Sequence, residues 1–455
     1  MLHNTHLRHP TQALETRLAD LLRHHGGGRG KGLLSISVAL PEQAFTSLPF
    51  GLDEHHYWAN PAEELSLFGV GRAAQVETQG EGRFRAMDAA FAEYRRLWEA
   101  VDADATGIQP ATLVGFAFDQ NQRVDILPNA RLTVPALLLQ RRGGSCAATF
   151  SCDRECSVEN TLAAWMANWH SLATASALQA PHDGILARVA STAADQAWLA
   201  LAQQAVNDIG AGTLDKVVLS RCLRLQADRP FAPAAVMAAL SARHADCYQF
   251  SHAEKGRGIF LGATPERLVS LRGGQVVSEA LAGTAWDAAS LDSLGDAKNL
   301  REHRLVLNAI VRALETACAF LEIPARPDRR ELPDLCHLRS LVKGSAKPGV
   351  TLLNLVERLH PTPAVGGYPM RRAQEWLASH GEARPAWYSG ATGWLGLDGD
   401  GDFAVALRCA WIKGNDADLY AGAGIVAGSD PATELAETEA KFKAILNALG
   451  CSRNH

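Results

Sequence analysis

The sequence lacks the features that mark membrane, secreted and nucleic-acid-binding proteins. None of its apolar runs approaches the roughly 18 residues of a membrane span, and its start, MLHNTHLRHPTQ, has no apolar core of a secretory signal. The 44 basic residues are outnumbered by 49 acidic ones and form no basic run. These absences argue against a membrane or nucleic acid as a partner and favour a cytoplasmic protein that acts on a small molecule.

Cysteine-based frameworks are also missing. The chain has nine cysteines but no Cys-x-x-Cys pair, which in a long chain without a signal predicts reduced thiols. A zinc site from Cys146, Cys152, Cys156 and a distant histidine is the weaker alternative. The HExxH and GxSxG patterns are absent, so zinc peptidases and serine hydrolases have no support.

Helical and strand-like patterns alternate along the whole chain, which is 47% hydrophobic. Consecutive strands joined by short turns, such as the one at Arg272-Gly273-Gly274, imply antiparallel pairing. We therefore predict an α+β fold, a single large unit of antiparallel β-sheets sandwiched by helices. The expected helices are 12–24, 84–100, 159–175, 193–208, 231–243 and 298–321, and the expected strands are 33–39, 111–118, 131–140, 145–151, 215–225, 247–252, 258–262, 267–272 and 275–280.

The most informative segment is YAGAGIVAGSDPATELAETEAKF at 420–442. It joins the Gly422-x-Gly424 turn to a helix that carries Glu434, Glu437 and Lys441. Residues three and four apart share one face of a helix, so two carboxylates and an ammonium point into the same space. Mg²⁺ on these carboxylates could hold an acidic ligand.

Each of these helical residues also has a purely structural interpretation. Glu434 follows Asp430-Pro431, a good N-cap and first-turn pair, and acids in a first turn complement the helix dipole. Glu437 and Lys441 have the spacing of an ordinary helical ion pair. Residue spacing alone leaves both interpretations open.

Lys216 and Glu266 are candidates for an acid–base pair. Lys216 lies on a mainly apolar strand, where a lysine is usually an exposed edge charge, but burial would lower its pKa and make it a usable base. Glu266 follows Pro265 in a turn between strands and is either solvated, paired with Arg267, or placed in an apolar pocket that raises its pKa.

Two further candidates come from elsewhere in the chain. Glu302 opens an apolar-periodic helix, either as a metal ligand or as a common first-turn acid. Arg408 is expected within the strand AVALRCAWI, where Ala406 and Ala410 as same-face neighbours leave room for the guanidinium to grip a carboxylate. Packing of the arginine against a neighbouring strand is the alternative.

A dinucleotide-binding interpretation of Gly422-x-Gly424-x-x-Ala427 fails. That motif needs a second parallel strand ending in an acid about 20 residues further on. The helix that follows runs to about 448 and leaves no room for such a strand in the 455 residues. The glycines more plausibly let backbone N–H groups approach an anion.

Four blocks, taken in this order, resemble the chorismate-utilising enzymes, and most closely the isochorismate synthases. They are DKVVLSR at Lys216, LGATPERL at Glu266, KNLREHRLV at Glu302 and the segment 420–442. The resemblance covers roughly 195–448 and implies a single fold of large antiparallel sheets with the site in a cleft between them. It divides the chain into 1–190, a divergent N-terminal part of the same fold, and 191–455, the chorismate-binding catalytic region.

The resemblance also assigns roles to individual residues. It makes Lys216 the base that activates water and Glu266 the acid that protonates a departing hydroxyl, with His337 near the ring hydroxyls. Mg²⁺ would be bound by Glu302 and Glu437, with Glu434 contributing. Substrate binding would fall to Tyr388 and Arg408 at the enolpyruvyl carboxylate and to Gly283, Thr284, Gly422 and Lys441 around the rest of the anion.

The implied reaction adds water at C2 of chorismate while the C4 hydroxyl leaves, and the resemblance favours a monomer. Salicylate synthases, which also expel pyruvate, rank second because they usually carry a stretch ending in Pro-Lys where this chain has LHPTPAVGGYP followed by Met370. The ammonia-using anthranilate and aminodeoxychorismate synthases lack a lysine at the position of Lys216. A non-catalytic chorismate-binding subunit is the third hypothesis, and menaquinone, siderophore and salicylate routes all remain open for the product.

Overall fold

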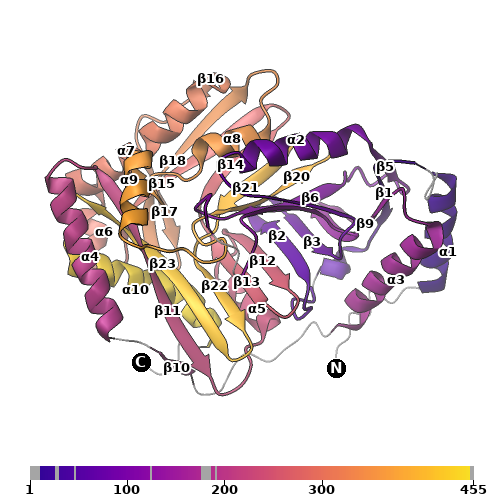
Figure 1. The fold of residues 1–455 in the computed structure, drawn as a ribbon, viewed down its shortest axis with the longest axis horizontal. Coiled ribbons are helices and arrows are strands. Elements are labelled where there is room, and N and C mark those ends of the chain that lie inside the picture. The colour runs from indigo at the N-terminus through magenta and orange to yellow at the C-terminus, as the bar shows by residue number, and fades with distance from the viewer. Residues whose placement is uncertain are drawn as a thin grey trace.

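The computed structural model describes residues 11–25, 30–45, 48–122, 126–175, 186–189 and 192–450, and it has the predicted α+β architecture (Figure 1). Within these residues the strands form two sheets, one of 13 strands and one of 10. All strand pairs are antiparallel except one, in which β1 runs parallel to β5. Helices cover the outer faces, and the described part of the chain has no helix long and apolar enough to cross a membrane.

The larger sheet has β10 at one edge and β5 at the other. Its order is β10 (Leu186–Arg188), β11 (Lys216–Ala227), β23 (Asp416–Val426), β22 (Cys409–Lys413), β13 (Gly258–Thr264), β12 (Tyr248–Glu254), β2 (His55–Asn60), β3 (Leu65–Val70), β8 (Leu137–Arg142), β9 (Ser145–Asp153), β1 (Leu33–Ala39) and β5 (Trp98–Asp102), with β19 (Gly367–Tyr368) beside β11.

The smaller sheet faces it. Its order is β16 (Cys318–Glu322), β18 (Leu335–Ala346), β15 (Gln275–Ala285), β14 (Arg267–Arg272), β21 (Gly401–Val405), β20 (Ala391–Gly396), β6 (Ala111–Phe116), β7 (Ala130–Val134) and β4 (Ala74–Thr78), with β17 (Asp328–Leu332) beside β18. Strands from before and after residue 190 pair directly in both sheets, as β2 does with β12 and β6 with β20. The division at 190 therefore does not separate the sheets, and it stays a prediction about the sequence.

The helices are α1 (Thr11–His24), α2 (Arg83–Arg96), α3 (Val158–Thr174), α4 (Thr192–Gly210), α5 (Pro233–Arg243), α6 (Ala288–Asp292), α7 (Ala297–Glu315), α8 (Leu352–Leu359), α9 (Met370–Ser379) and α10 (Pro431–Ala448). A buried cluster rich in aromatic rings joins the sheets, with Trp58 from β2, Phe260 from β13 and Trp394 from β20. Burying large aromatic side chains contributes strongly to core stability. Two further apolar clusters pack the outer helices onto the sheets.

Most of the predicted helices and strands are present, with boundaries shifted by a few residues. Three predictions are wrong. The strand expected at 131–140 is divided at Pro135 into β7 and β8, because proline cannot donate to a sheet ladder. The helix expected at 298–321 ends at Glu315, and its last part is the edge strand β16. The strand expected at AVALRCAWI is broken at Arg408, whose φ of +48° lies in the left-handed region, outside the range of a regular strand.

Candidate active site

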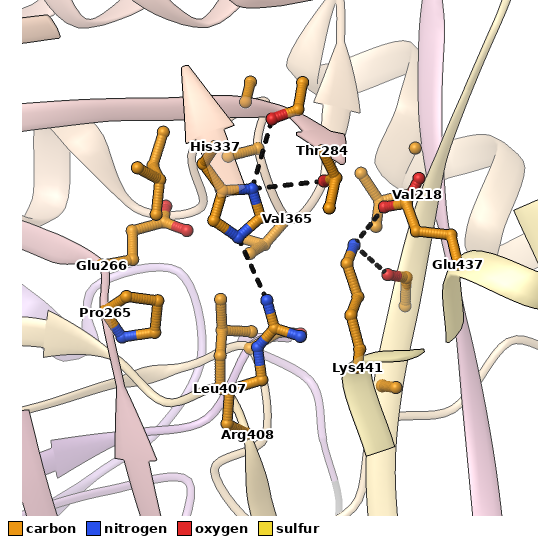
Figure 2. Close-up of a pocket in the computed structure, with 18 of the residues that line it drawn as sticks. Val218, Pro265, Glu266, Thr284, His337, Val365, Leu407, Arg408, Glu437 and Lys441 are labelled. Carbon is orange, nitrogen blue, oxygen red and sulfur yellow. Dashed lines mark hydrogen bonds and ion pairs between the residues drawn. The ribbon is translucent and has the colours of Figure 1, made fainter. Parts of the chain in front are cut away.

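A cavity lies between the two sheets, bordered by β11 and β23 on one side and β15 and β18 on the other. Figure 2 shows how its polar side chains converge, with Glu266, His337 and Arg408 facing Lys441 and Glu437. The cavity is lined by eleven of the residues predicted from the sequence, namely Lys216, Glu266, Gly283, Thr284, Glu302, His337, Tyr388, Arg408, Gly422, Glu437 and Lys441. Glu434 is the predicted site residue that does not line it.

Lys216 is buried, so the interpretation as an exposed edge charge is wrong. It is the first residue of β11 and pairs with Val426 on one side and with Tyr368 on the other, which places it inside the sheet. Only 1% of its surface is exposed. Its Nζ donates a hydrogen bond to Glu302 Oε1 at 2.8 Å, and this carboxylate compensates the cost of burying the ammonium.

Glu266 is neither solvated nor paired with its neighbour. It is 3% exposed in the turn between β13 and β14. Arg267 instead forms an ion pair with Glu63 at 2.6 Å and with Asp402 at 3.3 Å. Of the three interpretations that the sequence left open, the structure therefore supports the enclosed carboxyl group.

Burial, and after it the nearby Glu279 carboxylate, raise the pKa of Glu266 from 4.5 to about 8. The cations Lys216, Lys441 and Arg408 act in the opposite direction but do not cancel the effect. A carboxyl group with this pKa is mostly protonated at neutral pH and can donate a proton.

Arg408 sits in the break between β21 and β22, so its side chain is positioned by a left-handed residue and not by strand alternation. Its Nη2 donates to His337 Nε2 at 3.1 Å, while its buried Nη1 has no hydrogen-bond partner among the described residues. A buried guanidinium with a free donor is suited to bind a carboxylate.

His337 holds this arginine in place. Because Nε2 accepts from Arg408, the ring proton must be on Nδ1, which lies 3.2 Å from both the Gly283 carbonyl and Thr284 Oγ1. Burial, followed by the positive charges of Arg408 and Lys441, lowers the pKa of His337 well below its ordinary value. The ring is therefore neutral and fixes the guanidinium; the sequence indicated only proximity to the ring hydroxyls.

The glycines of the Gly422-x-Gly424 pair make room for other side chains. A Cβ at Gly424 would lie 2.8 Å from Glu302 Oε1 and 2.9 Å from Lys216 Cε. A Cβ at Gly422 would lie 2.9 Å from the Tyr388 hydroxyl. Both glycines lie within β23, so the turn expected here is wrong. The approach of their backbone N–H groups to an anion stays a prediction.

Tyr388 and Gly283 complete the wall. Tyr388 is 3% exposed and stacks on Tyr420 with ring centroids 5.3 Å apart. Gly283 has a φ of +80° where the register between β15 and β18 shifts, a conformation that favours glycine. After the shift Thr284 pairs with His337 of β18, and both residues border the cavity.

Each of the three predicted metal ligands has a lysine partner. Glu302 accepts from Lys216 at 2.8 Å, Glu437 from Lys441 at 2.5 Å, and Glu434 from Lys298 at 2.8 Å. The pair of Glu437 and Lys441 is the helical one expected from the sequence. Glu434 also accepts from Ser429 at 2.7 Å, and Asp430 caps its helix as predicted.

The described residues contain no group of three histidine, cysteine, aspartate or glutamate side chains arranged to hold a metal ion. Glu302 and Glu437 nevertheless fit Mg²⁺, since both line the cavity and offer hard oxygen donors. Mg²⁺ in enzymes is commonly held by one or two carboxylates, with water and substrate completing its shell. The zinc alternative is not supported, because the described cysteines, Cys146, Cys152 and Cys156 among them, are free and belong to no such group.

Sequence reasoning missed residues that act on the predicted ones. Thr362 lies with its hydroxyl 3.5 Å from Glu266 Oε1, and Lys298 reaches from α7 to Glu434 on α10. Thr362 belongs to the LHPTPAVGGYP stretch and Lys298 to the KNLREHRLV block, so both were within motifs that the sequence analysis singled out. Glu302 is not a first-turn acid either, because α7 begins at Ala297.

The sequence matches one family model and resembles two isochorismate synthases over most of its length. The family model described as chorismate binding enzyme matches residues 29–450. The isochorismate synthase MenF of Bacillus subtilis is 30% identical over 421 residues, covering 87% of this chain and 88% of that protein. The salicylate biosynthesis isochorismate synthase of Pseudomonas aeruginosa is 34% identical over 418 residues, covering 86% and 84%.

Two solved structures have a fold similar to that of this chain. MenF, the menaquinone-specific isochorismate synthase from Escherichia coli, superposes with a TM-score of 0.78 at 28% identity, covering 96% of this chain and 99% of that one. Anthranilate synthase component I from Streptococcus pneumoniae, at 19% identity, has a TM-score of 0.67 and covers 84% and 92%. At that identity the second likeness establishes the fold alone.

Proposed function

The chain belongs to the chorismate-binding enzyme family, and we propose that it converts chorismate to isochorismate. The observation that carries the proposal is one cavity lined by a buried lysine, a carboxyl group with a pKa of about 8 and a buried arginine with a free donor. This combination supplies a base, an acid and an anchor for a carboxylate. It supports the roles that the sequence resemblance assigned.

In the proposed reaction Lys216 takes a proton from a water molecule while the water oxygen forms a bond to C2 of the ring. The double bonds shift, the C4–oxygen bond breaks, and Glu266 gives its proton to the departing hydroxyl, which leaves as water. General acid and general base catalysis each contribute roughly 10²- to 10⁴-fold. Proton exchange with solvent then restores Lys216 and Glu266.

Binding is assigned to the cations and backbone around the ring. Arg408, held by His337, takes the enolpyruvyl carboxylate with Tyr388 beside it, and Lys441 with Gly283, Thr284 and Gly422 surrounds the rest of the anion. A monomeric state stays a prediction from the resemblance. A cytoplasmic location stays a prediction.

Glu302 and Glu437 are the residues that would hold Mg²⁺. When bound there, the ion would neutralise and orient the ring carboxylate. Glu434 would need to act through water or to move, because it lies outside the cavity lining and is held by Lys298 and Ser429.

The proposal is tested by incubating the protein with chorismate and Mg²⁺ and separating the products by liquid chromatography. We expect isochorismate, and we expect no product from Lys216→Met or after treatment with EDTA. Isochorismate formation unaffected by Lys216→Met would overturn the assignment of the base. Rapid release of pyruvate with salicylate fluorescence would favour the salicylate synthase alternative, and binding of chorismate without any turnover would favour the non-catalytic subunit.

A further inference from the structure

The strand that carries Lys216 has a gap on one side, between its pairing with β19, which ends at Val217, and its pairing with β10, which begins at Leu225. On one side β11 pairs with β23 over its whole length, but on the other side β19 pairs only with Lys216 and Val217. Beyond that point the backbone groups of Val218 and Ser220 on this side have no strand to bind. Unpaired backbone groups next to a buried cavity would be costly and would loosen the strand.

Three side chains and one backbone carbonyl bind these groups in place of a strand. Arg384 Nη2 donates to the Val218 carbonyl at 2.7 Å, and the Ser220 N–H donates to Glu382 Oε1 at 2.7 Å. Trp198 Nε1 donates to the Ser220 carbonyl at 3.0 Å, and the Val218 N–H donates to the Gly366 carbonyl at 3.1 Å. The N–H and carbonyl groups of both Val218 and Ser220 are therefore hydrogen-bonded.

Arg384 and Glu382 also form a pair with each other. Arg384 Nε donates to Glu382 Oε2 at 3.1 Å, and the two side chains are 2% and 5% exposed. The guanidinium lies 3.8 Å from the ring centroid of Phe118, and its Nη1 donates to the Val365 carbonyl. A buried ion pair of this kind is weak evidence for stability by itself, because desolvation opposes it.

The pair connects three parts of the cavity wall. Val218 and Val365 line the cavity, and Tyr388 follows four residues after Arg384 along the chain. Arg384 thus binds the strand of the lysine to the loop at Val365, and the planar guanidinium can do so because it donates in several fixed directions at once. Lysine has no such geometry.

We propose that Glu382 and Arg384 are positioning residues that hold β11, and with it Lys216, at the working distance from the substrate. This inference rests on the proposed function, because it assumes that Lys216 is the base. Arg408 and Lys441, the charged groups assigned to the anion, belong to other elements, so we expect binding to depend on the pair less than the placement of Lys216 does. Misplacement of a reacting group by about 1 Å can cost on the order of 10²-fold in rate.

The test compares Arg384→Met with the matched control Arg371→Met, whose arginine lies on α9 with its side chain 91% exposed. We expect Arg384→Met to lower kcat on the order of 10- to 100-fold while KM for chorismate changes less than about threefold. Hydrogen exchange should become faster in the peptide that contains Val218 and Ser220 but not in β2, which is remote from the pair. Arg371→Met should match the unaltered protein in all three measurements.

A folded Arg384→Met protein with the kcat of Arg371→Met overturns the proposal, as does exchange that rises equally in β11 and β2. If Arg384→Met does not fold, Glu382→Gln decides, since it keeps the acceptor for Ser220 N–H and removes only the charge that holds Arg384. A lowered kcat with unchanged KM supports the proposal, and an unchanged kcat refutes it. Should the unaltered protein not consume chorismate, the proposed function fails, while hydrogen exchange still tests the hold on β11.

Discussion

Replacing Glu266 with glutamine should remove activity and stabilise the protein, and the gain in stability should depend on pH. The folded protein raises the pKa of this group from its ordinary 4.5 to about 8. Between these two pH values the unfolded chain has lost the proton while the folded protein still holds it. Stability therefore falls as pH rises through this window, and it levels off above about 8.

The magnitude follows from the same two values. Each pH unit within the window costs the folded protein about 1.4 kcal/mol. Glutamine has no proton to hold, so the stabilising effect of Glu266→Gln should grow by about 3 kcal/mol between about pH 5.5 and about pH 8. At pH 7 a pKa of about 8 keeps about nine-tenths of the Glu266 carboxyl groups protonated. The burial that lowers the stability of the folded protein thus also keeps Glu266 able to donate a proton.

Urea unfolding at both pH values provides the assay, with Glu375→Gln on the exposed face of α9 as the control. The control should show no gain that depends on pH. A gain for Glu266→Gln that is the same at both pH values would refute the reasoning, because it would show that the carboxyl group ionises normally in the folded protein. In the activity assay the same variant should lose roughly 10²- to 10⁴-fold in kcat, and kcat of the unaltered protein should fall as pH rises above about 8.

Three other predictions follow from the same site and from the core. Gly424→Ala places a Cβ 2.8 Å from Glu302 Oε1. Steady-state kinetics should therefore show a kcat that is lowered at least about tenfold. Full activity would mean that Glu302 can move aside without loss. Arg408→Lys loses the paired donors, so KM for chorismate should rise about tenfold or more, which corresponds to about 1.4 kcal/mol, and an unchanged KM would exclude it as the anchor. Burial lowers the pKa of His252 well below its ordinary value of 6.5, so the free energy of unfolding should fall as pH drops below 6.5. In urea unfolding, His252→Asn should lose less of this free energy at about pH 5 than the unaltered protein does.

The order of the motifs, through the resemblance to chorismate-utilising enzymes, predicted most of the residues that line the cavity. The helical spacing of Glu437 and Lys441 gave their ion pair directly. The α+β class followed from the alternating patterns and the short turns, which depend on local sequence. Such local signals are the most reliable part of a sequence.

Tertiary placement could not be predicted in the same way. The burial of Lys216 depends on two strands that are distant in sequence, β19 and β23. Nothing in AVALRCAWI indicates that Arg408 adopts a left-handed conformation, because alanine-rich alternation is also typical of an unbroken strand. The partnership of Lys298 with Glu434 joins residues that are 136 positions apart, and no periodicity reports on such a contact.

The order of strands in the two sheets has a consequence for biosynthesis. The last strands of the fold, β20 to β23, are inserted in the interior of both sheets, between partners that were translated much earlier. Until they emerge from the ribosome, β13, β14 and β6 each lack a neighbour, and long-range pairing of this kind is slow and leaves open edges. The two sheets therefore stay open at these positions of the growing chain until β20 to β23 have been made.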